Sequence, residues 1–456
     1  MLITDTAYLN AELMDVVRLF GAEDAGIVHT FRRDGENYIN TVRSGGVCRT
    51  YTDVWQAEGE LALRRCAKRS AKLALYLFLS ELTGKTFPWG ALTGIRPTKM
   101  AYAELSEGRD FAPLFRKFSV SEENIAMIRR VLAAQGEIYR KNRGMGADLF
   151  VGLPFCPTKC EYCSFITAPM PAVQRYVGEY TDCVISELES LKGMDIKFNS
   201  VYIGGGTPFC LENEQLTRIY AAINALGADG AEFTVEAGRP DTFTDEKLAA
   251  CKEAGVTRIC VNPQTFSDET LARIGRRHTA EQVIDAYYMA EKYGFDINID
   301  LIAGLPGEDP GDFRNSLSLA VQLQPENITV HSLCLKSGSR LKEHVSRIDG
   351  GEIDEMIAFS REMLTSAGYE PYYLYRQKYQ AGANENTGWC RPGKACAYNI
   401  GTMEEICSNI AVGAGAISKR VFGGGSRIER LASPKDIPSY LAKCAAIIRE
   451  RLKLFE

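Results

Sequence analysis

Residues 148–165 read DLFVGLPFCPTKCEYCSF, an apolar, strand-like run followed directly by a loop that contains three cysteines. Cys156, Cys160 and Cys163 are close enough in sequence to hold one zinc ion or one iron–sulfur cluster. A structural zinc site needs four ligands, and the loop contains no fourth cysteine and no histidine. Three thiolates on a four-iron cluster would leave one iron open to a further ligand. The loop therefore favours a catalytic cluster, with zinc as the alternative.

From this strand to about residue 345, apolar runs alternate with amphipathic helical patterns. Such alternation predicts repeated βα units around a parallel sheet. The six expected strands are 148–153, 200–205, 232–237, 258–263, 297–302 and 328–333, and the helices expected between them are 176–191, 214–226, 245–254, 280–292 and 312–323. Six units predict an α/β protein with an open, partial (β/α)6 barrel.

The sequence on either side of the barrel predicts two further regions. Short strand-like pieces precede long helical patterns over residues 1–147, which predicts an N-terminal α+β accessory domain. The segment KNRGMGA at 141–147 combines charge with glycine and marks the boundary. After the barrel at 148–345, helical runs flank segments rich in glycine and tyrosine. We therefore expect a mainly helical, substrate-covering domain over residues 346–456.

The composition excludes several classes of protein. The chain has 456 residues, 45% of them hydrophobic, and a net charge of −5, which lacks the basic excess of a nucleic-acid-binding protein. The first residues lack the layout of a signal peptide, and no run is as long as a bilayer-spanning helix. We therefore expect a cytoplasmic protein in which most of the 14 cysteines are reduced. Cys66, Cys183 and Cys251 lie in helical patterns and are expected to be small buried thiols.

Glycine and polar residues occur where the predicted strands end. They are Gly204, Gly205, Gly206 and Thr207 after the second strand, Glu236 at the end of the third, Asn262 and Gln264 after the fourth, and Asp300 late in the fifth. Because parallel barrels form their active sites at the carboxyl ends of the strands, we expect these residues to converge on one mouth. Three successive glycines let a carboxylate or amino-acid group approach backbone amides, and a tight turn is the alternative explanation. His331 falls on the sixth strand, where a core position and a lining position are both open.

Together these motifs resemble those of the radical S-adenosylmethionine (SAM) superfamily. The spacing Cys-x3-Cys-x2-Cys stands on the first loop of the barrel, and GGGTP follows the second strand. A fuller set, TVEAGRP, PQTF, IGRRHT and INIDLIAGLPGE, resembles the branch of oxygen-independent coproporphyrinogen III dehydrogenases, also called oxidases. PWGALTGIRPTK, PYYLYRQK and VGAGAISK resemble the long bacterial form of that branch.

The resemblance implies a set of cofactors and the residues that hold them. Cys156, Cys160 and Cys163 would hold a four-iron, four-sulfur cluster, and SAM would chelate the open iron through its amino and carboxylate groups. The residues that would contact SAM are Phe155 at the adenine, Gly204, Gly205, Gly206 and Thr207 along the methionine part, Glu236, Gln264 and Asp300 at the ribose, and Arg276 at the carboxylate.

The resemblance also implies an activity. SAM cleaved by an electron from the cluster would yield a radical that removes hydrogen from a propionate of coproporphyrinogen III, and loss of carbon dioxide would leave a vinyl group. Two rounds give protoporphyrinogen IX. The best-known members carry a Tyr-x-His pair and a fourth cysteine where this chain has Phe150, Gly152 and Phe165. These departures concern the substrate rather than the cluster or SAM, and the sequence identifies neither the electron donor nor the acceptor.

Two alternatives stay open. A haem-binding or haem-transfer protein of the same superfamily would need an axial ligand, which the tyrosine-rich stretch 372–379 could supply. Radical modification of another tetrapyrrole is the second alternative. A tetrapyrrole with propionates needs cations, and the candidates are Arg96, Lys99, Arg376, Lys378 and Lys419. A further cysteine group, Cys390, Cys396 and Cys407, is too loosely spaced for an auxiliary cluster, and we expect free thiols there.

Overall fold

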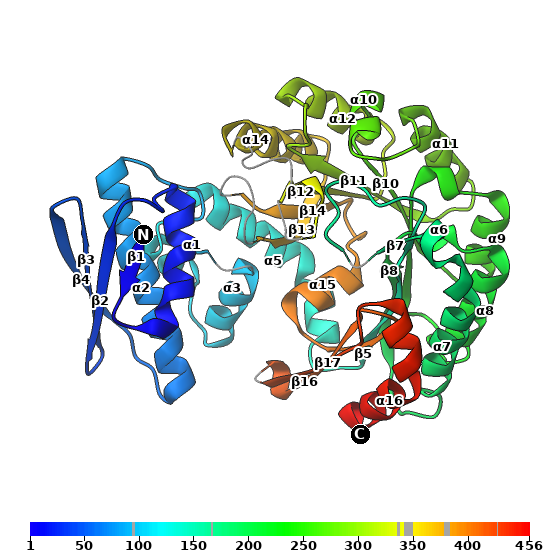
Figure 1. The fold of residues 1–456 in the computed structure, drawn as a ribbon, viewed down its shortest axis with the longest axis horizontal. Helices are drawn as coiled ribbons and strands as arrows, with labels where there is room; N and C mark the ends of the chain where they lie inside the picture. The colour runs from blue at the N-terminus through cyan, green and yellow to red at the C-terminus, as the bar shows by residue number, and fades with distance from the viewer. Residues whose placement is uncertain (94–95, 166, 335–337, 342–349, 378–383, 426) are drawn as a thin grey trace. The chain divides into compact units, whose positions relative to one another are not determined.

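The computed structural model describes residues 1–93, 96–165, 167–334, 338–341, 350–377, 384–425 and 427–456. These residues fold as two units (Figure 1). The smaller unit contains Met1–Arg129 and Arg376–Asn384, and the larger unit contains Arg130–Tyr375 and Glu385–Glu456. The division into domains at 1–147, 148–345 and 346–456 stays a prediction.

A four-stranded sheet with helices packed on it makes up the smaller unit. The elements are β1 (Leu2–Thr4), α1 (Asn10–Phe20), β2 (Ile27–Asp34), β3 (Asn37–Ser44), β4 (Val47–Val54), α2 (Glu60–Thr83), α3 (Pro97–Ser106) and α4 (Ala112–Lys117). In β3, the alternate residues Tyr38, Asn40 and Val42 are buried, and Asn40 donates to Ser70 of α2 at 2.8 Å. A period of two is typical of a strand with one face on a core. The α+β fold predicted for this region is confirmed.

One large sheet organises the larger unit. Its strands and those of a small ladder are β5 (Ala147–Leu153), β6 (Phe155–Cys156), β7 (Ala168–Pro169), β8 (Phe198–Gly205), β9 (Glu232–Gly238), β10 (Arg258–Gln264), β11 (Asp296–Ala303), β12 (Asn327–Ser332), β13 (Glu370–Tyr375), β14 (Asn386–Cys390), β15 (Ser408–Val412), β16 (Ile417–Phe422) and β17 (Arg427–Ala432). The helices are α5 (Glu122–Asn142), which begins before the boundary of the unit, α6 (Met170–Val173), α7 (Val177–Glu189), α8 (Asn213–Asn224), α9 (Asp245–Glu253), α10 (Asp268–Arg273), α11 (Ala280–Glu291), α12 (Pro310–Gln322), α14 (Gly350–Ser366), α15 (Ala397–Glu404) and α16 (Ile437–Phe455).

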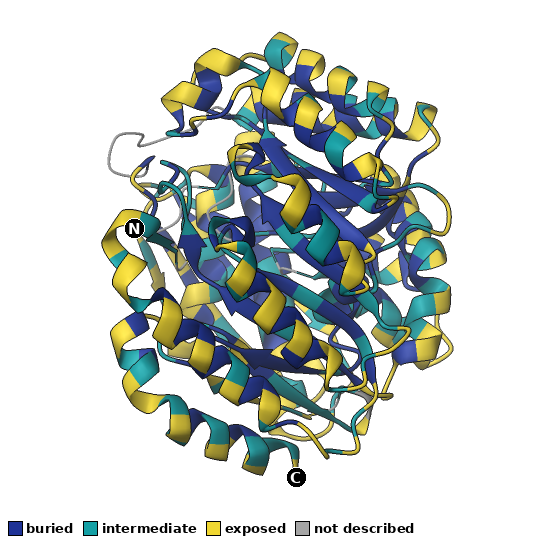
Figure 2. Cartoon of the chain, turned by 90° about the vertical axis from the view of Figure 1, so that its right-hand side faces the viewer, coloured by how far each residue is buried: buried dark blue, intermediate teal, exposed yellow. Residues whose placement is uncertain are grey.

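The centre of this sheet is parallel. The strand order over the described residues is β13-β14-β12-β11-β10-β9-β8-β5-β15-β16-β17, and neighbours from β12 to β15 run in the same direction. β10 is buried at six of its seven residues, which is typical of a parallel strand covered on both faces. Figure 2 shows these buried strands with helices around them whose exposed residues face outward. All six predicted strands are present, and the partial α/β barrel is confirmed.

The region after the barrel contributes strands as well as helices. β15 pairs in parallel with β5, the first barrel strand, while β14 pairs antiparallel with β12, the last one. α14, α15 and α16 supply the predicted helices. Short strands that pair with partners far away in the sequence leave no local periodicity, so the sequence does not reveal that this region extends the sheet at both ends.

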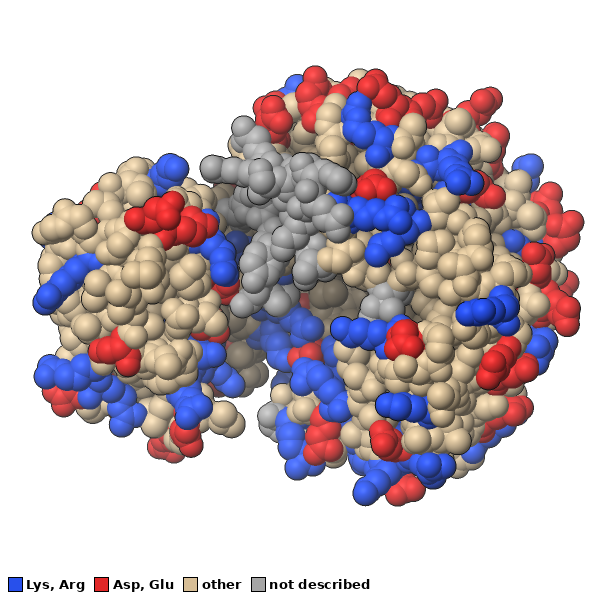
Figure 3. Space-filling model, in the orientation of Figure 1, with Lys and Arg blue, Asp and Glu red and all other residues tan. Residues whose placement is uncertain are grey.

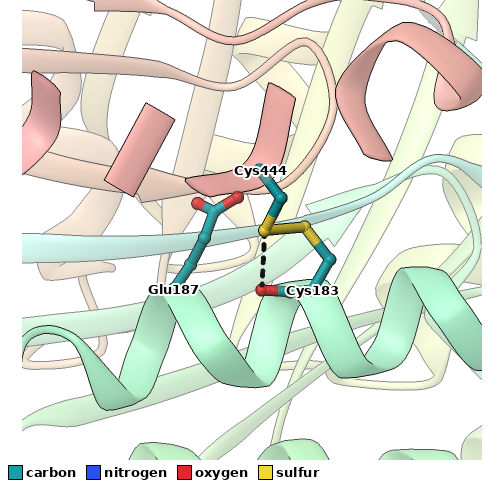
Figure 4. A group of neighbouring side chains, drawn as sticks. All are labelled: Cys183, Glu187 and Cys444. Carbon is teal, nitrogen blue, oxygen red and sulfur yellow. Dashed lines mark hydrogen bonds between the residues drawn. A yellow bond between two sulfur atoms is a disulfide. The ribbon is translucent and has the colours of Figure 1, made fainter. Parts of the chain in front are cut away.

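The last helix, α16, is joined to α7 by a disulfide, which Figure 4 shows beside Glu187, and by a buried ion pair. Cys183 and Cys444 form the disulfide, with their Cα atoms 6.3 Å apart. The expectation of a free thiol at Cys183 is therefore wrong, because contact between helices 261 residues apart cannot be read from either helix alone. Glu187 accepts from Tyr440 at 2.5 Å and pairs with Arg451 at 2.6 Å. Burial raises the pKa of the Glu187 carboxyl, and the charge of Arg451 opposes this.

The surface carries charge of both signs. On the face drawn in Figure 3, Lys and Arg side chains lie among Asp and Glu side chains over both units. Within the described ranges, no helix combines the length and the apolar character that crossing a bilayer requires.

We predict that Arg451→Met destabilises the protein by about 3 to 5 kcal/mol, because it leaves the fully buried Glu187 carboxylate without its counter-charge. Thermal unfolding should show a melting temperature lower by roughly 5 to 15 °C. The double variant Glu187→Gln/Arg451→Met should recover part of this loss. Arg449→Met, an exposed change on the same helix, is the matched control. Equal melting temperatures for the two arginine variants would contradict the prediction.

Candidate cofactor site

The cysteine loop is tied at its base to the first barrel strand. β6 and β7 pair with each other, and the Ala168 amide donates to the Pro154 carbonyl at 2.7 Å. Farther along the loop, the Thr158 hydroxyl donates to the Gly275 carbonyl at 3.0 Å, beyond the end of α10. These bonds close the loop over the carboxyl end of β5, where the sequence predicts the mouth of the barrel.

The three cysteines differ in their surroundings. Cys160 is buried, whereas Cys156 and Cys163 are half-buried, and the Thr207 hydroxyl lies 3.7 Å from the Cys156 sulfur. Burial raises the pKa of the Cys156 thiol to about 11 and also raises that of Cys163. A bound metal replaces these thiol protons, so the burial that disfavours a free thiolate does not prevent the sulfurs from serving as metal ligands.

The glycine turn after β8 packs against the cysteine loop through backbone atoms. The Thr207 amide donates to the Phe155 carbonyl at 2.6 Å. A Cβ atom on Gly206 would lie 2.4 Å from that same carbonyl oxygen, so no side chain fits there. Gly205 has a φ of 101°, which only glycine adopts without strain. The turn thus brings bare backbone to the cysteines, as expected for a site that receives a small polar group.

Two carboxylates lie beside this turn on the barrel wall. Glu236 accepts from the Tyr202 hydroxyl at 2.7 Å and from the Gly205 amide at 3.3 Å. A Cβ atom on Gly204 would lie 2.6 Å from the Glu236 carboxylate, so this glycine also makes room for it. Burial, together with the nearby charge of Asp300, raises the pKa of Glu236 to about 7. Tyr202 was not predicted as a site residue, because the sequence around it does not distinguish it from a tyrosine in the core.

The end of β10 carries unsatisfied polar atoms. Gln264 has a φ of 74° at a register shift of the strand, a conformation that costs energy for any residue other than glycine. Among the residues that the structure describes, Asn262 Oδ1, Gln264 Oε1 and Arg276 Nε are buried and find no hydrogen-bond partner. Arg276 also donates through one terminal nitrogen to the Asn262 and Pro263 carbonyls, at 2.5 and 2.9 Å. Buried orphan atoms of this kind fit a ligand that has donors and acceptors of its own.

The structure brings most of the predicted residues together, and Phe155 takes part through its backbone rather than through its ring. The Phe155 side chain is fully buried and meets Tyr180 edge-on, so only its backbone faces the glycine turn. The aromatic residue near Arg276 is Tyr162, which packs on the hydrophobic cluster of Leu271, Ile274, Ile302, Leu305, Leu333 and Leu341. The position of Tyr162 between the second and third cysteines is the sequence signal that could have identified it as a site residue. The donor set of three thiols, bare amides, two carboxylates and orphan polar atoms fits a cluster with an amino-acid-containing cofactor.

Comparison with known proteins gives the family. Residues 150–320 match the family model described as the Radical SAM superfamily. The chain is 38% identical over 407 residues to the oxygen-independent coproporphyrinogen-III oxidase-like protein HemZ of Bacillus subtilis, covering 84% of this chain and 80% of that protein. The chain belongs to the radical SAM superfamily. Within it, the chain falls in the group of coproporphyrinogen oxidase-like proteins, and its cofactors are a four-iron, four-sulfur cluster and SAM.

Two further proteins match smaller parts of the chain. The heme chaperone HemW of Bacillus subtilis is 35% identical over 193 residues, which cover 41% of this chain and 50% of that protein. Among solved structures, the coproporphyrinogen III oxidase HemN from Escherichia coli matches with a TM-score of 0.54 and 19% identity, over 68% of this chain and 71% of that chain. The second match concerns the fold alone.

We predict that Gly206→Ala weakens SAM binding by at least about tenfold, because the added methyl group must push the glycine turn away from Phe155. Equilibrium dialysis of SAM with the anaerobically reconstituted protein measures this. Gly178→Ala, at a helical glycine with open space around it, is the matched control and should bind SAM normally. If both variants bind SAM like the unmodified chain, the glycine turn does not form the cofactor site.

Proposed function

We propose that the chain catalyses the oxygen-independent oxidative decarboxylation of coproporphyrinogen III propionates to vinyl groups, which gives protoporphyrinogen IX. The observation that carries the proposal is the similarity to HemZ over most of both chains. The names of HemZ, HemN and HemW all concern tetrapyrroles or haem, and this supports a tetrapyrrole as the ligand. The supply and removal of electrons fall to a donor and an acceptor still to be identified.

In this proposal Cys156, Cys160 and Cys163 hold the cluster. SAM lies along Gly204, Gly205, Gly206 and Thr207, with Glu236, Gln264 and Asp300 at the ribose and Arg276 at the carboxylate. When bound, these cofactors would supply the one-electron chemistry that takes a hydrogen atom from a propionate, and the loss of carbon dioxide would pass one further electron to the acceptor. The chain's residues orient the cofactor beside the substrate.

The aromatic side chains expected to contact a tetrapyrrole form a column of three rings in the larger unit. Tyr202 stacks on Tyr398 with ring centroids 4.4 Å apart, and Phe150 lies parallel to both at 6.3 and 6.2 Å. Because the Tyr202 hydroxyl donates a hydrogen bond to Glu236, this aromatic column extends to the cofactor site. Stacked aromatic rings are suited to contact with a broad, largely apolar ligand.

The departures from the best-known members have a structural reason in this chain. Phe150 belongs to the aromatic column, where a ring without a hydroxyl packs between carbon atoms. The Gly152 carbonyl accepts from the Tyr180 hydroxyl at 2.7 Å. Gly413 packs closely on the same carbonyl, since a Cβ atom added to Gly413 would lie 2.3 Å from its oxygen. A Cβ atom at residue 152 would lie 3.3 Å from both the Phe150 ring and the Val412 carbonyl oxygen, so a histidine side chain would be crowded there and we expect proton transfer to use other residues. Phe165 is 71% exposed beside the cysteine loop.

The predicted cations are divided between the two units. Arg376 belongs to the smaller unit, where it donates to the Leu92 carbonyl and lies over the Trp89 ring, and Lys419 pairs with Glu405 at 3.4 Å in the larger unit. Arg96 and Lys99 are residues of the smaller unit, while Lys378 lies outside the described residues. Contact of these cations with propionates stays a prediction.

Haem binding is the second candidate function, favoured by the match to HemW. In the predicted tyrosine-rich stretch, Tyr372 and Tyr373 are core residues, whereas Tyr375 is half-buried. Tyr379 lies outside the described residues. The HemW match covers half of that protein, less than the HemZ match covers of HemZ, and this is why decarboxylation is preferred. Radical modification of another tetrapyrrole is the third possibility.

The test is anaerobic incubation of the reconstituted protein with coproporphyrinogen III, SAM, a low-potential reductant and a one-electron acceptor, which takes the electron that each decarboxylation releases. Mass spectrometry should find protoporphyrinogen IX, with about one SAM cleaved for each carbon dioxide released. Cys163→Ala is the inactive control, and haem titration of the same preparation measures the competing function. Cleavage of SAM without release of carbon dioxide, or tight stoichiometric haem binding alone, would contradict the proposal.

A further inference from the structure

A chain of polar side chains on β11, β12 and β13 leads to one of the two carboxylates of the cofactor site. Tyr373 donates to Thr329 at 3.4 Å, Thr329 donates to Asn298 at 3.2 Å, and the Asn298 amide donates to Asp300 Oδ1 at 2.7 Å. One oxygen of Asp300 is therefore held by the sheet itself. The absence of a side chain at Gly388 makes this possible, because a Cβ there would lie 1.9 Å from the Tyr373 ring.

His331 of β12 lies on the other side of the same carboxylate. Its Nε2 is 3.9 Å from Asp300 Oδ2, and its Nδ1 is 3.4 Å from the Tyr375 hydroxyl. The rings of His331 and Tyr375 meet edge to face. The His331 side chain is 26% exposed and that of Asp300 is 17% exposed, so the imidazole stands at the border between the packed wall and the open mouth.

The negative charges of Glu236 and Asp300 on the barrel wall explain why an imidazole is needed beside them. Glu236 and Asp300 are close enough for the charge of Asp300 to add to the effect of burial and raise the pKa of Glu236. His331 acts on Glu236 in the opposite direction. Two carboxylates that share a partly buried wall repel each other, and a neighbouring positive or hydrogen-donating group relieves the repulsion.

We propose that His331, held between Asp300 and Tyr375, is a positioning residue that fixes the Asp300 carboxylate for SAM. The proposal rests on the SAM site proposed above but not on the identity of the substrate. Without the imidazole, Asp300 keeps its bond to Asn298, but Oδ2 loses the neighbouring ring 3.9 Å away and can turn toward or away from the cofactor. A direct contact of His331 with a substrate carboxylate is disfavoured, because such a group would approach Asp300 and Glu236 as well.

The test is the affinity for SAM, measured anaerobically by equilibrium dialysis on the reconstituted full chain without any tetrapyrrole. His331→Ala should weaken SAM binding by about tenfold, while the iron content stays that of the unmodified chain. His331→Gln can keep a donor toward Asp300 and should restore most of the affinity. In SAM cleavage assays, the KM for SAM of His331→Ala should rise more than its kcat falls.

The tyrosine partner supplies a matched pair of variants. Tyr375→Phe removes the hydroxyl that lies beside His331 Nδ1, and it should weaken SAM binding by a smaller factor than His331→Ala. Tyr372→Phe makes the same chemical change on the same strand, but that hydroxyl accepts from Asn399 instead, so SAM binding should not change.

Unchanged SAM affinity in His331→Ala would overturn the proposal. Equal losses in His331→Ala and His331→Gln, or equal losses in both tyrosine variants, would overturn it too, since a general packing role would then explain the data. The outcome is separable from the proposed reaction, because a chain that binds SAM through His331 but leaves coproporphyrinogen III unchanged refutes only the reaction.

Discussion

The backbone contact between Gly206 and Phe155 is the constraint on which the site depends. It joins the turn after β8 to the loop after β5, so the residues expected to hold the amino-acid part of SAM lie beside the three cysteines. A side chain at residue 206 would have to displace main-chain atoms, which no rotamer change can avoid. The packing of the parallel sheet thereby determines the geometry of the cofactor site.

The site is built at a cost in stability that the rest of the barrel offsets. Glu236 has a raised pKa, Gln264 has a strained backbone, and one buried nitrogen of Arg276 has no hydrogen-bond partner among the described residues. Such features are typical of functional sites, where binding of a ligand supplies the missing partners. In the same unit, the Glu187–Arg451 pair and the disulfide between α7 and α16 tie the last helix to the barrel.

The sequence was sufficient to predict the six barrel strands and the glycine and polar residues at their ends, whose roles toward the cofactors stay predictions. Buried parallel strands and amphipathic helices have strong periodic patterns, and glycines at strand ends mark turns that approach a ligand. The sequence did not indicate contacts made over long separations, such as β15 beside β5 and Cys183 on Cys444. Side-chain direction was also hidden, since Phe155 and Tyr162 both flank cysteines and only the fold determines that Tyr162 lies near Arg276.

The central claim is that Cys156, Cys160 and Cys163 hold a four-iron cluster with one iron open to SAM. The most direct test is the electron paramagnetic resonance spectrum of the anaerobically reconstituted, reduced protein, recorded before and after addition of SAM. The account predicts a four-iron cluster signal that changes when SAM binds and that is lost or altered in Cys163→Ala. A spectrum that SAM leaves unchanged although it binds, or a protein that holds zinc and no iron, would contradict it.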